Sequence, residues 1–195
     1  YRLPRNIIAR MQSLEYDRSF LAARILLDKI NANMIISGAF GLFEKKTVIA
    51  VGGYDNSTMG EDMELVVRLH EFSRMNRKPY KIHFAQDAIC WSQTPEKLSE
   101  LCKQRKRWQR GLFQCMWGHR KMLANPRYGA VGLLSYLYFL LYELLSPFIE
   151  LLGVLTMVLS VVMDMLNVKF MLVFLACYAL YGILLTLTAY FSRIY

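Results

Sequence analysis

The chain has 195 residues, of which 55% are hydrophobic and 20% are charged. This composition excludes a disordered or fibrous protein and is more apolar than that of a typical small soluble enzyme. The charges are unevenly spread. Residues 1–129 carry 22 Lys or Arg and 12 Asp or Glu, a net charge of +10. Residues 130–195 carry two Lys or Arg and three Asp or Glu, a net charge of −1. We therefore expect a basic, water-facing part over 1–129 and a membrane region over 130–195.

The first residue and the cysteines add two further expectations. The chain starts at Tyr1 within an amphipathic pattern, without an initiator Met or a signal peptide, so we expect a piece of a longer protein. The cysteines form no C-x-x-C pair and have no histidine at zinc-ligand spacing, which indicates reduced thiols and not a disulfide framework. These cysteines are Cys90, Cys102, Cys115 and Cys177.

Helical and turn patterns alternate over the first part of the chain. Apolar positions recur at helical spacing over 4–31, which predicts a long helix with a basic polar face. Residues 34–36 predict a short strand, and the Ser-Gly and Gly within 37–41 indicate a tight backbone that can approach a ligand. A short helix is predicted at 45–51, ended by the two glycines that follow it.

The next segments predict one helix and two strands. A T-x-x-E sequence at 58–61 matches the capping box, so we expect a helix from near Thr58 to about Met75. Two short segments, 79–84 and 88–91, have the alternating or apolar character of strands. The water-facing part is therefore predicted to be mixed α/β, with too few strands to close a sheet alone.

A second long helix is predicted to carry the basic segment KQRKRWQR. Thr94 suits a helix cap and Pro95 the first helical position, and the helix is expected to continue to about Leu123. An Asn-Pro pair at 125–126 should break it just before the membrane region. Because Lys and Arg beside a membrane favour the cytoplasmic side, this segment places 1–129 in the cytoplasm. The segment also attracts anionic lipid, which accounts for the charge without nucleic acid.

The membrane region predicts more than one crossing. As a single helix, residues 130–166 would reach roughly 55 Å, well beyond the ~30 Å hydrocarbon core. Pro147 favours a kink, so we expect an interfacial or half helix at 131–146 and a span at about 147–165. A second span at about 169–191 makes the predicted topology multi-pass.

Two carboxylates interrupt the first apolar segment. Glu143 and Glu150 are seven residues apart and share a helical face on either side of the proline. Carboxylates at membrane depth are costly and usually face protein or water. They indicate either a polar seam toward a substrate channel, or interfacial placement with hydrogen bonds between helices.

The first candidate for chemistry is Gly60-Glu61-Asp62 at a predicted helix start. The helix dipole favours acidic residues in a first turn, so a purely structural role is one interpretation. The glycine-rich segment VGGYDNSTMG before it allows the backbone to approach a ligand. An Asp placed there can accept a proton from a substrate hydroxyl within hydrogen-bond reach.

The second candidate is the basic segment. On a helix, Gln104, Arg107, Trp108 and Gly111 fall on one face and offer an amide, a guanidinium, an indole and a gap. Guanidinium groups, including that of the neighbouring Arg105, match the oxygens of a diphosphate. The indole and the gap suit a sugar ring. The alternative is a basic juxtamembrane helix with one tryptophan at the interface.

Taken in order, EYDRSF, ISGAFGLF, VGGYDNSTMGEDMEL and QRKRW, followed by two apolar spans, resemble the C-terminal half of membrane-embedded family 2 glycosyltransferases. That family includes the synthases of cellulose, hyaluronan and poly-N-acetylglucosamine. The resemblance implies an α/β fold, namely the C-terminal part of a GT-A-type glycosyltransferase domain followed by transmembrane α-helices. Residues 1–129 would then be the acceptor-side half of a cytoplasmic catalytic domain.

The resemblance also implies roles for individual residues. Asp62 would be the general base that deprotonates the acceptor hydroxyl in an inverting transfer. The residues expected at the donor diphosphate are Gln104, Arg105 and Arg107. Those expected at the acceptor are Trp108, Ser37, Gly38 and Glu61.

The expected cofactor and partners follow from the same resemblance. The family's nucleotide-binding half, with a D-x-D for the metal, should lie upstream, and no D-x-D is present here. A divalent metal (Mg or Mn) is therefore expected in the parent protein with ligands outside this chain, and this piece alone should be inactive. The expected partners are a UDP-linked or other nucleotide-sugar donor, a glycan or lipid acceptor and membrane lipids, at the bacterial inner membrane and without nucleic acid.

Three functions stay open from the sequence. The chain belongs to a polysaccharide synthase, which SGAFGLF and GGYD favour, or to a transferase that adds one sugar to a lipid. The third is a non-catalytic membrane anchor with a basic lipid- or nucleic-acid-binding face. An anchor explains the charge and the spans, but not why the acidic turn and the Gln-Arg-Trp face occur together.

Overall fold

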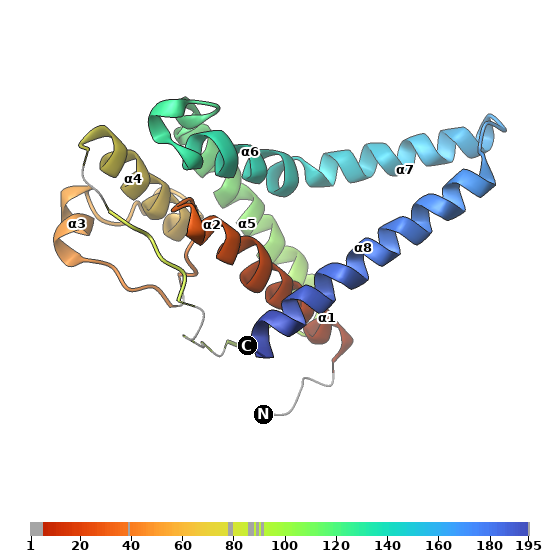
Figure 1. Cartoon of the computed structure of the whole chain (residues 1–195), viewed down its shortest axis with the longest axis horizontal. Coiled ribbons are helices and arrows are strands. Elements are labelled where there is room, and N and C mark those ends of the chain that lie inside the picture. Colours follow the sequence, from red (N-terminus) through yellow and green to blue (C-terminus); the bar gives the residue numbers. More distant parts are fainter. Residues whose placement is uncertain are drawn as a thin grey trace.

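The computed structural model describes residues 6–38, 40–77, 80–85, 88, 90 and 92–194, and most of these residues are helical. Figure 1 shows a group of helices from α1 to α6 and two long helices, α7 and α8, which extend from this group and meet at their far ends. The candidate site lies within the group of shorter helices.

The N-terminal rod is one continuous helix in three pieces. α1 (Ile7–Arg18) and α2 (Ile25–Lys29) are α-helical, and the turns between them, Ser19–Arg24, are π-helical. Asn6 caps the start, because its side chain accepts a 2.8 Å hydrogen bond from the backbone N–H of Ile8. The predicted long N-terminal helix is therefore confirmed within the described residues.

No strand is found among the described residues, so the predicted mixed α/β fold is not confirmed. Residues 34–36 and 80–84 run without helical structure, but neither has a neighbouring strand. An isolated strand does not form in water, because its backbone groups need partners on another strand. The other candidate strand, 88–91, lies largely outside the described residues, as does residue 79.

Side chains near the end of α2 take the place of a partner strand for the segment at 80–84. The amide of Asn31 donates to the carbonyl of Tyr80 at 3.2 Å and accepts from the N–H of Ile82 at 3.0 Å. A carboxylate oxygen of Asp28 accepts from the N–H of Phe84 at 2.7 Å. This segment is thus tied to the rod through its backbone.

α3 (Lys45–Ala50) is short and ends at a pair of glycines, as predicted. Gly52 and Gly53 have φ angles of 95° and 75°, which a residue with a side chain rarely adopts. Arg68 of the following helix donates to the carbonyls of Val51 at 2.8 Å and Gly53 at 2.6 Å. The glycine turn is therefore fixed against that helix.

α4 (Glu61–Met75) ends where expected but begins after the predicted start. Its N-cap is Gly60, without a side-chain hydrogen bond. The capping-box prediction is wrong because the chain turns earlier: the N–H of Ser57 donates to the carboxylate of Asp55 at 2.9 Å. Thr58 lies in this turn, with its hydroxyl 3.5 Å from the carbonyl oxygen of Asp55.

α5 (Leu98–Gly118) is shorter at both ends than predicted. The expected start is displaced because the chain there binds the rod: Gln12 donates to the carbonyl of Pro95 at 2.8 Å. Asn6 likewise donates to the carbonyl of Glu96 at 3.0 Å. The middle of the predicted helix is correct, and both of its ends are wrong.

Two tight turns lead from α5 to the membrane region. They are 3₁₀ turns at Arg120–Met122 and Pro126–Tyr128. The side chain of Asn125 accepts from the N–H of Arg127 at 3.0 Å, which starts the second turn. The Asn-Pro pair starts this second turn, but it does not end the helix as predicted, because α5 already ends at Gly118.

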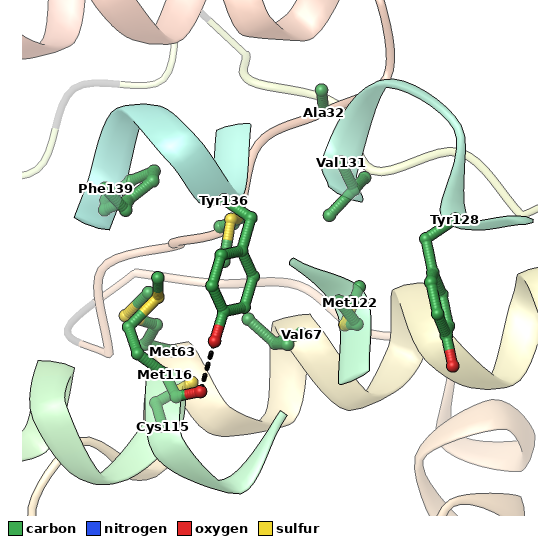
Figure 2. Close-up of a cluster of buried hydrophobic side chains, with 11 residues drawn as sticks. Ala32, Met63, Val67, Cys115, Met116, Met122, Tyr128, Val131, Tyr136 and Phe139 are labelled. Atoms are coloured by element: carbon green, nitrogen blue, oxygen red, sulfur yellow. Dashed lines mark hydrogen bonds between the residues drawn. The ribbon is translucent and has the colours of Figure 1, made fainter. Parts of the chain in front are cut away.

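Figure 2 shows the buried core, where α4, the end of α5 and the chain that follows it meet. The hydroxyl of Tyr136 donates to the carbonyl of Met116, and that of Ser135 donates to the carbonyl of Ala32 at 2.6 Å. Burial raises the pKa of the Cys115 thiol to about 12, so this cysteine packs as an apolar residue. The core consists of Ala32, Met34, Met63, Val67, Cys115, Met116, Met122, Tyr128, Val131, Tyr136 and Phe139.

The first part of the membrane region is bent. Val131–Ser135 and Phe139–Leu144 are π-helical on either side of the short α6 (Tyr136–Tyr138), and α7 (Ser146–Val162) follows at an angle of 48°. Pro147 lies in the first turn of α7, where its missing N–H costs no hydrogen bond. The predicted kink is confirmed.

α8 (Val168–Ile194) contains the one stretch, Val168–Thr188, that by itself is long and apolar enough to cross a membrane within the described residues. None of this stretch is buried in the protein. The two parts of the bent segment, Val131–Leu144 and Ser146–Val162, pass the same test only together. The second predicted span thus lies in α8, but the predicted multi-pass topology is not supported beyond this helix.

Candidate functional site

Asp62 lies in the first turn of α4 and meets the loop at Ser37 and Gly38. Its Oδ2 accepts a hydrogen bond of 3.0 Å from the N–H of Gly38, and its Oδ1 accepts one of 2.8 Å from the N–H of Met63. A carboxylate is favoured here, because the first N–H groups of a helix have no partner within it. Glu61 beside it is exposed. The structure thus brings the predicted base and the predicted Ser-Gly loop together.

The start of α4 packs on α5 through two glycines. A Cβ atom on Gly111 would lie 2.7 Å from the nitrogen and 2.8 Å from the Cα of Gly60, closer than real Cβ contacts. Next to this contact, the N–H of Met59 donates to the side-chain oxygen of Gln114 at 3.0 Å. The gap at Gly111 is therefore filled by protein backbone, and the expectation that it receives a sugar ring is wrong. Its effect is to set Asp62 beside α5.

Arg24, which the sequence does not single out, interacts electrostatically with Asp62. Arg24 ends the π-helical turns of the rod and is partly buried. Burial lowers the pKa of its guanidinium to about 10, while the nearby carboxylates of Asp62 and Glu143 act in the opposite direction. Arg24 thus feels the charge of both the predicted base and Glu143 of the bent segment.

α5 is also tied directly to the bent segment. The side-chain nitrogen of Gln109 donates to the carbonyl of Leu144 at 2.9 Å, next to Glu143. Carbonyls at the end of a helix lack partners inside it, so this bond supplies one at the bend. The helix that carries the Q-x-x-R-W sequence is therefore fixed both to α4 and to the membrane region.

Three residues of the Q-x-x-R-W sequence keep free binding capacity. The side-chain oxygen of Gln104 is buried without a hydrogen-bond partner among the described residues. Arg107 is exposed and forms no ion pair within the described part of the chain. Trp108 is 40% exposed. Their expected roles at the diphosphate and the acceptor stay predictions.

Arg105 is turned toward the rod. Its Nη1 and Nη2 donate to the two carboxylate oxygens of Glu15 at 2.7 and 2.6 Å, a bidentate ion pair. The centre of its guanidinium lies 4.7 Å from the centroid of the Trp108 ring, and that ring lies 6.4 Å from the ring of Tyr16. Both terminal nitrogens of Arg105 are occupied, and its expected place at the donor diphosphate stays a prediction.

A polar network between α4 and the end of α5 also escaped the sequence analysis. The ring of His119 lies between two carboxylates of α4, with Nδ1 at 2.8 Å from Glu71 and Nε2 at 3.4 Å from Glu64. Glu64 also accepts from Arg68 at 2.6 Å. The seven-residue spacing of the two glutamates places them on one face of α4, which was the signal available; their partner is too distant in sequence to be inferred.

The described residues contain no cluster of side chains suited to bind a metal ion. No group of three or more His, Cys, Asp or Glu side chains lies close enough there to hold a metal ion. The divalent metal that the resemblance implies, with ligands outside this chain, stays a prediction.

Comparisons with known proteins agree with the resemblance. The model of the family described as "Glycosyl transferase family group 2" matches residues 1–194. The chain is 32% identical over 120 residues to the poly-β-1,6-N-acetyl-D-glucosamine synthase of Staphylococcus aureus (strain COL). It is 31% identical over 120 residues to the synthase of the same name from Staphylococcus epidermidis (strain ATCC 35984).

The matched stretch is 62% of this chain and 26% of each relative, so it spans about a quarter of the length of these synthases. No solved structure matches the chain. The family match, in contrast, runs over nearly all of its residues. This chain therefore belongs to glycosyl transferase family group 2.

Proposed function

We propose that this chain is the acceptor-side part of an inverting membrane glycosyltransferase that extends a polysaccharide from a UDP-linked sugar. The names of the synthases that it resembles support N-acetylglucosamine as the sugar and a polymer as the product. The family supports glycosyl transfer, and the apolar α8 supports a place at the bacterial inner membrane, with residues 1–129 on the cytoplasmic side.

One observation carries the proposal. The carboxylate of Asp62 meets the N–H of Gly38 at 3.0 Å, and the Gly60–Gly111 contact places the same helix start against α5. These two contacts bring the start of α4 to the Ser-Gly loop and to Gly111 of α5, which supports treating the three segments as one site. A purely structural cap would not need the Ser-Gly loop or the Q-x-x-R-W helix beside it.

The chemistry divides between the two sides of this site. The acceptor oxygen attacks the anomeric carbon opposite the diphosphate, and Asp62 takes the proton of the acceptor hydroxyl. The bond between the anomeric carbon and the diphosphate oxygen breaks, and its electron pair leaves with UDP. Arg107 and Gln104 hold the diphosphate, where a guanidinium stabilises the charge that develops. The residues at the acceptor are Trp108, Ser37, Gly38 and Glu61.

The chain acts as part of a longer protein. We place the ligands of the divalent metal and most of the nucleotide pocket outside it, as the resemblance to the family implies. The chain alone would therefore be inactive. Because a base works only within hydrogen-bond reach of its proton, holding the acceptor against Asp62 would supply much of the rate.

The experiment is UDP release by membranes that carry the complete protein, offered a panel of UDP-sugars. Asp62→Asn keeps the size of the side chain but removes the base, so we expect release to fall at least about a hundredfold. The matched control is Asp55→Asn in the preceding loop, which keeps the side-chain oxygen that binds Ser57 and should leave release unchanged.

The products separate the alternatives. A polymer of the sugar that supports release agrees with the proposal, whereas a single-sugar lipid product would replace the polymer by a lipid acceptor. Equal release by wild type and Asp62→Asn would mean that Asp62 is only a helix cap. No release with any sugar, from protein present in normal amount, would favour a non-catalytic anchor.

A further inference from the structure

One face of α1 follows the chain that leads into α5. Gln12, Glu15 and Tyr16 are spaced at i, i+3 and i+4 and therefore share a face of this helix. Gln12 binds the carbonyl of Pro95, Glu15 binds Arg105, and Tyr16 contacts the ring of Trp108. Figure 1 shows the rod and α5 side by side. The rod can therefore fix the orientation of side chains on α5.

Arg105 is the centre of these contacts. Its planar guanidinium binds both oxygens of Glu15 through one edge, and its centre lies 4.7 Å from the centroid of the Trp108 ring. The pair is partly exposed, with 36% of the Arg105 side chain and 51% of the Glu15 side chain accessible. A simple surface ion pair of this kind contributes little. A bidentate pair that also stacks a guanidinium on an indole fixes the orientation of both groups.

The indole has no other fixed polar partner in the contacts described. Trp108 is 40% exposed, and an exposed side chain samples several rotamers unless its neighbours restrict it. The contacts that restrict it are the guanidinium of Arg105 and the ring of Tyr16, at 4.7 and 6.4 Å from its own ring. Glu15 acts on the indole only through Arg105.

We infer that Glu15 and Arg105 are positioning residues that hold the indole of Trp108 in place for the acceptor sugar. The inference rests on the proposed function and extends it from the site itself to the N-terminal rod. It gives Arg105 a role distinct from binding the donor diphosphate, because its terminal nitrogens are engaged by Glu15. Loss of the pair should therefore affect use of the acceptor more than use of the donor.

The kinetic test uses membranes with the complete protein, saturating UDP-N-acetylglucosamine and a short β-1,6-linked N-acetylglucosamine oligosaccharide as the acceptor. Glu15→Gln and Arg105→Gln should each raise the acceptor KM about tenfold, with the donor KM within about twofold of wild type. The double variant should be no worse than Arg105→Gln alone, since Glu15 acts through Arg105. The matched control is Glu100→Gln, which removes an exposed carboxylate of α5 paired with Lys97 at 3.9 Å and should leave both values unchanged.

A second measurement reads the indole directly. In a variant of the complete protein that keeps Trp108 as its single tryptophan, with the others replaced by phenylalanine, Glu15→Gln should make the Trp108 emission about twice as sensitive to acrylamide. An unchanged acceptor KM in Glu15→Gln, additive effects in the double variant, or unchanged quenching would each overturn the inference. Absence of UDP release from the wild type would overturn the proposed function instead, and the quenching result would still decide whether Glu15 holds the indole.

Discussion

His70 is a titratable residue that the fold buries almost completely. It is 2% exposed, and its Nε2 donates to the carbonyl of Asn33 at 2.8 Å. Burial lowers the pKa of His70 to about 4, from its usual 6.5. Because the unfolded chain binds this proton more readily, the stability contributed by neutral His70 is complete above pH 6.5 and is lost as the pH falls toward 4.

Thermal unfolding of the protein in detergent checks this prediction between pH 7.5 and pH 4.5. The lowered pKa of His70 corresponds to at most about 3 kcal/mol of unfolding free energy over that range. His70→Gln should flatten the pH dependence, whereas His83→Gln should retain it, because His83 is exposed beside Asp28. An identical pH slope in His70→Gln would show that other groups carry the acid sensitivity.

Among single residues, the sequence reveals those that belong to a local motif and misses those whose partners are distant in the sequence. The sequence singles out Asp62 because an Asp after a glycine-rich segment is a recognisable pattern, and its role as the base stays a prediction. It does not single out Arg24 or Glu15, since their surroundings depend on the rod lying against α4 and α5. Arg105 was assigned to the donor side from its neighbours in sequence, while the structure shows it bound to Glu15.

The crossing of α4 and α5 is the contact between elements that shapes the site. A Cβ at Gly111 would meet the nitrogen of Gly60 at 2.7 Å, and backbone atoms cannot move aside as a flexible side chain can. Gly111→Ala should therefore push the start of α4 away from α5 and cost roughly 1–3 kcal/mol of stability. It should also lower glycosyl transfer, because Asp62 lies in the displaced turn.

Gly118→Ala is the matched control for this substitution. Gly118 ends the same helix, and nothing lies within 4 Å of the Cβ that alanine would add. Alanine is the better helix former by about 1 kcal/mol, so this change should leave stability equal or slightly higher. Thermal unfolding and UDP release of the two variants check the prediction, and equal behaviour of Gly111→Ala and Gly118→Ala would contradict it.

The helix interiors were predictable from the sequence, and their ends were not. The interior over 7–29 follows from apolar spacing, and that over 98–118 from a start signal followed by a long stretch without helix breakers. Ends depend on local competition: Asp55 turns the chain before Thr58 can cap α4, and the rod binds the carbonyl of Pro95 before α5 begins. The strands predicted at 34–36 and 79–84 are not found for a different reason, because a strand is stable only with a partner strand, and the described residues supply none.

In the whole molecule, the N-terminal rod contacts the C-terminal helix α8. Arg18 of the rod donates to the hydroxyl of Thr186 at 3.0 Å and to the carbonyl of Gly182 at 2.9 Å. Figure 1 shows α8 passing beside α1 at this point. A guanidinium is costly inside hydrocarbon, so we expect the C-terminal end of the span to lie at the membrane surface, on the same side as the rod.

The position of the turn between α7 and α8 depends on whether both helices cross the membrane. The candidate span of 21 residues in α8 is about 31 Å long, which matches the hydrocarbon core. Figure 1 places the turn that joins the two helices at the end remote from the rod. Asp164 lies in this turn, with a φ angle of 54°. We therefore expect Asp164 to emerge on the membrane face opposite the rod.

Labelling with a membrane-impermeant maleimide checks this topology in cells that express the complete protein. In a variant with Asp164→Cys as its single cysteine, we expect labelling of intact cells. In a variant that keeps only Cys102, which is exposed on α5, labelling should require permeabilised cells. If Asp164→Cys also required permeabilisation, α7 and α8 would enter and leave the membrane on the same side. The site would then stand beside a re-entrant pair, and the proposed glycosyl transfer would take place without a membrane crossing by this part of the chain.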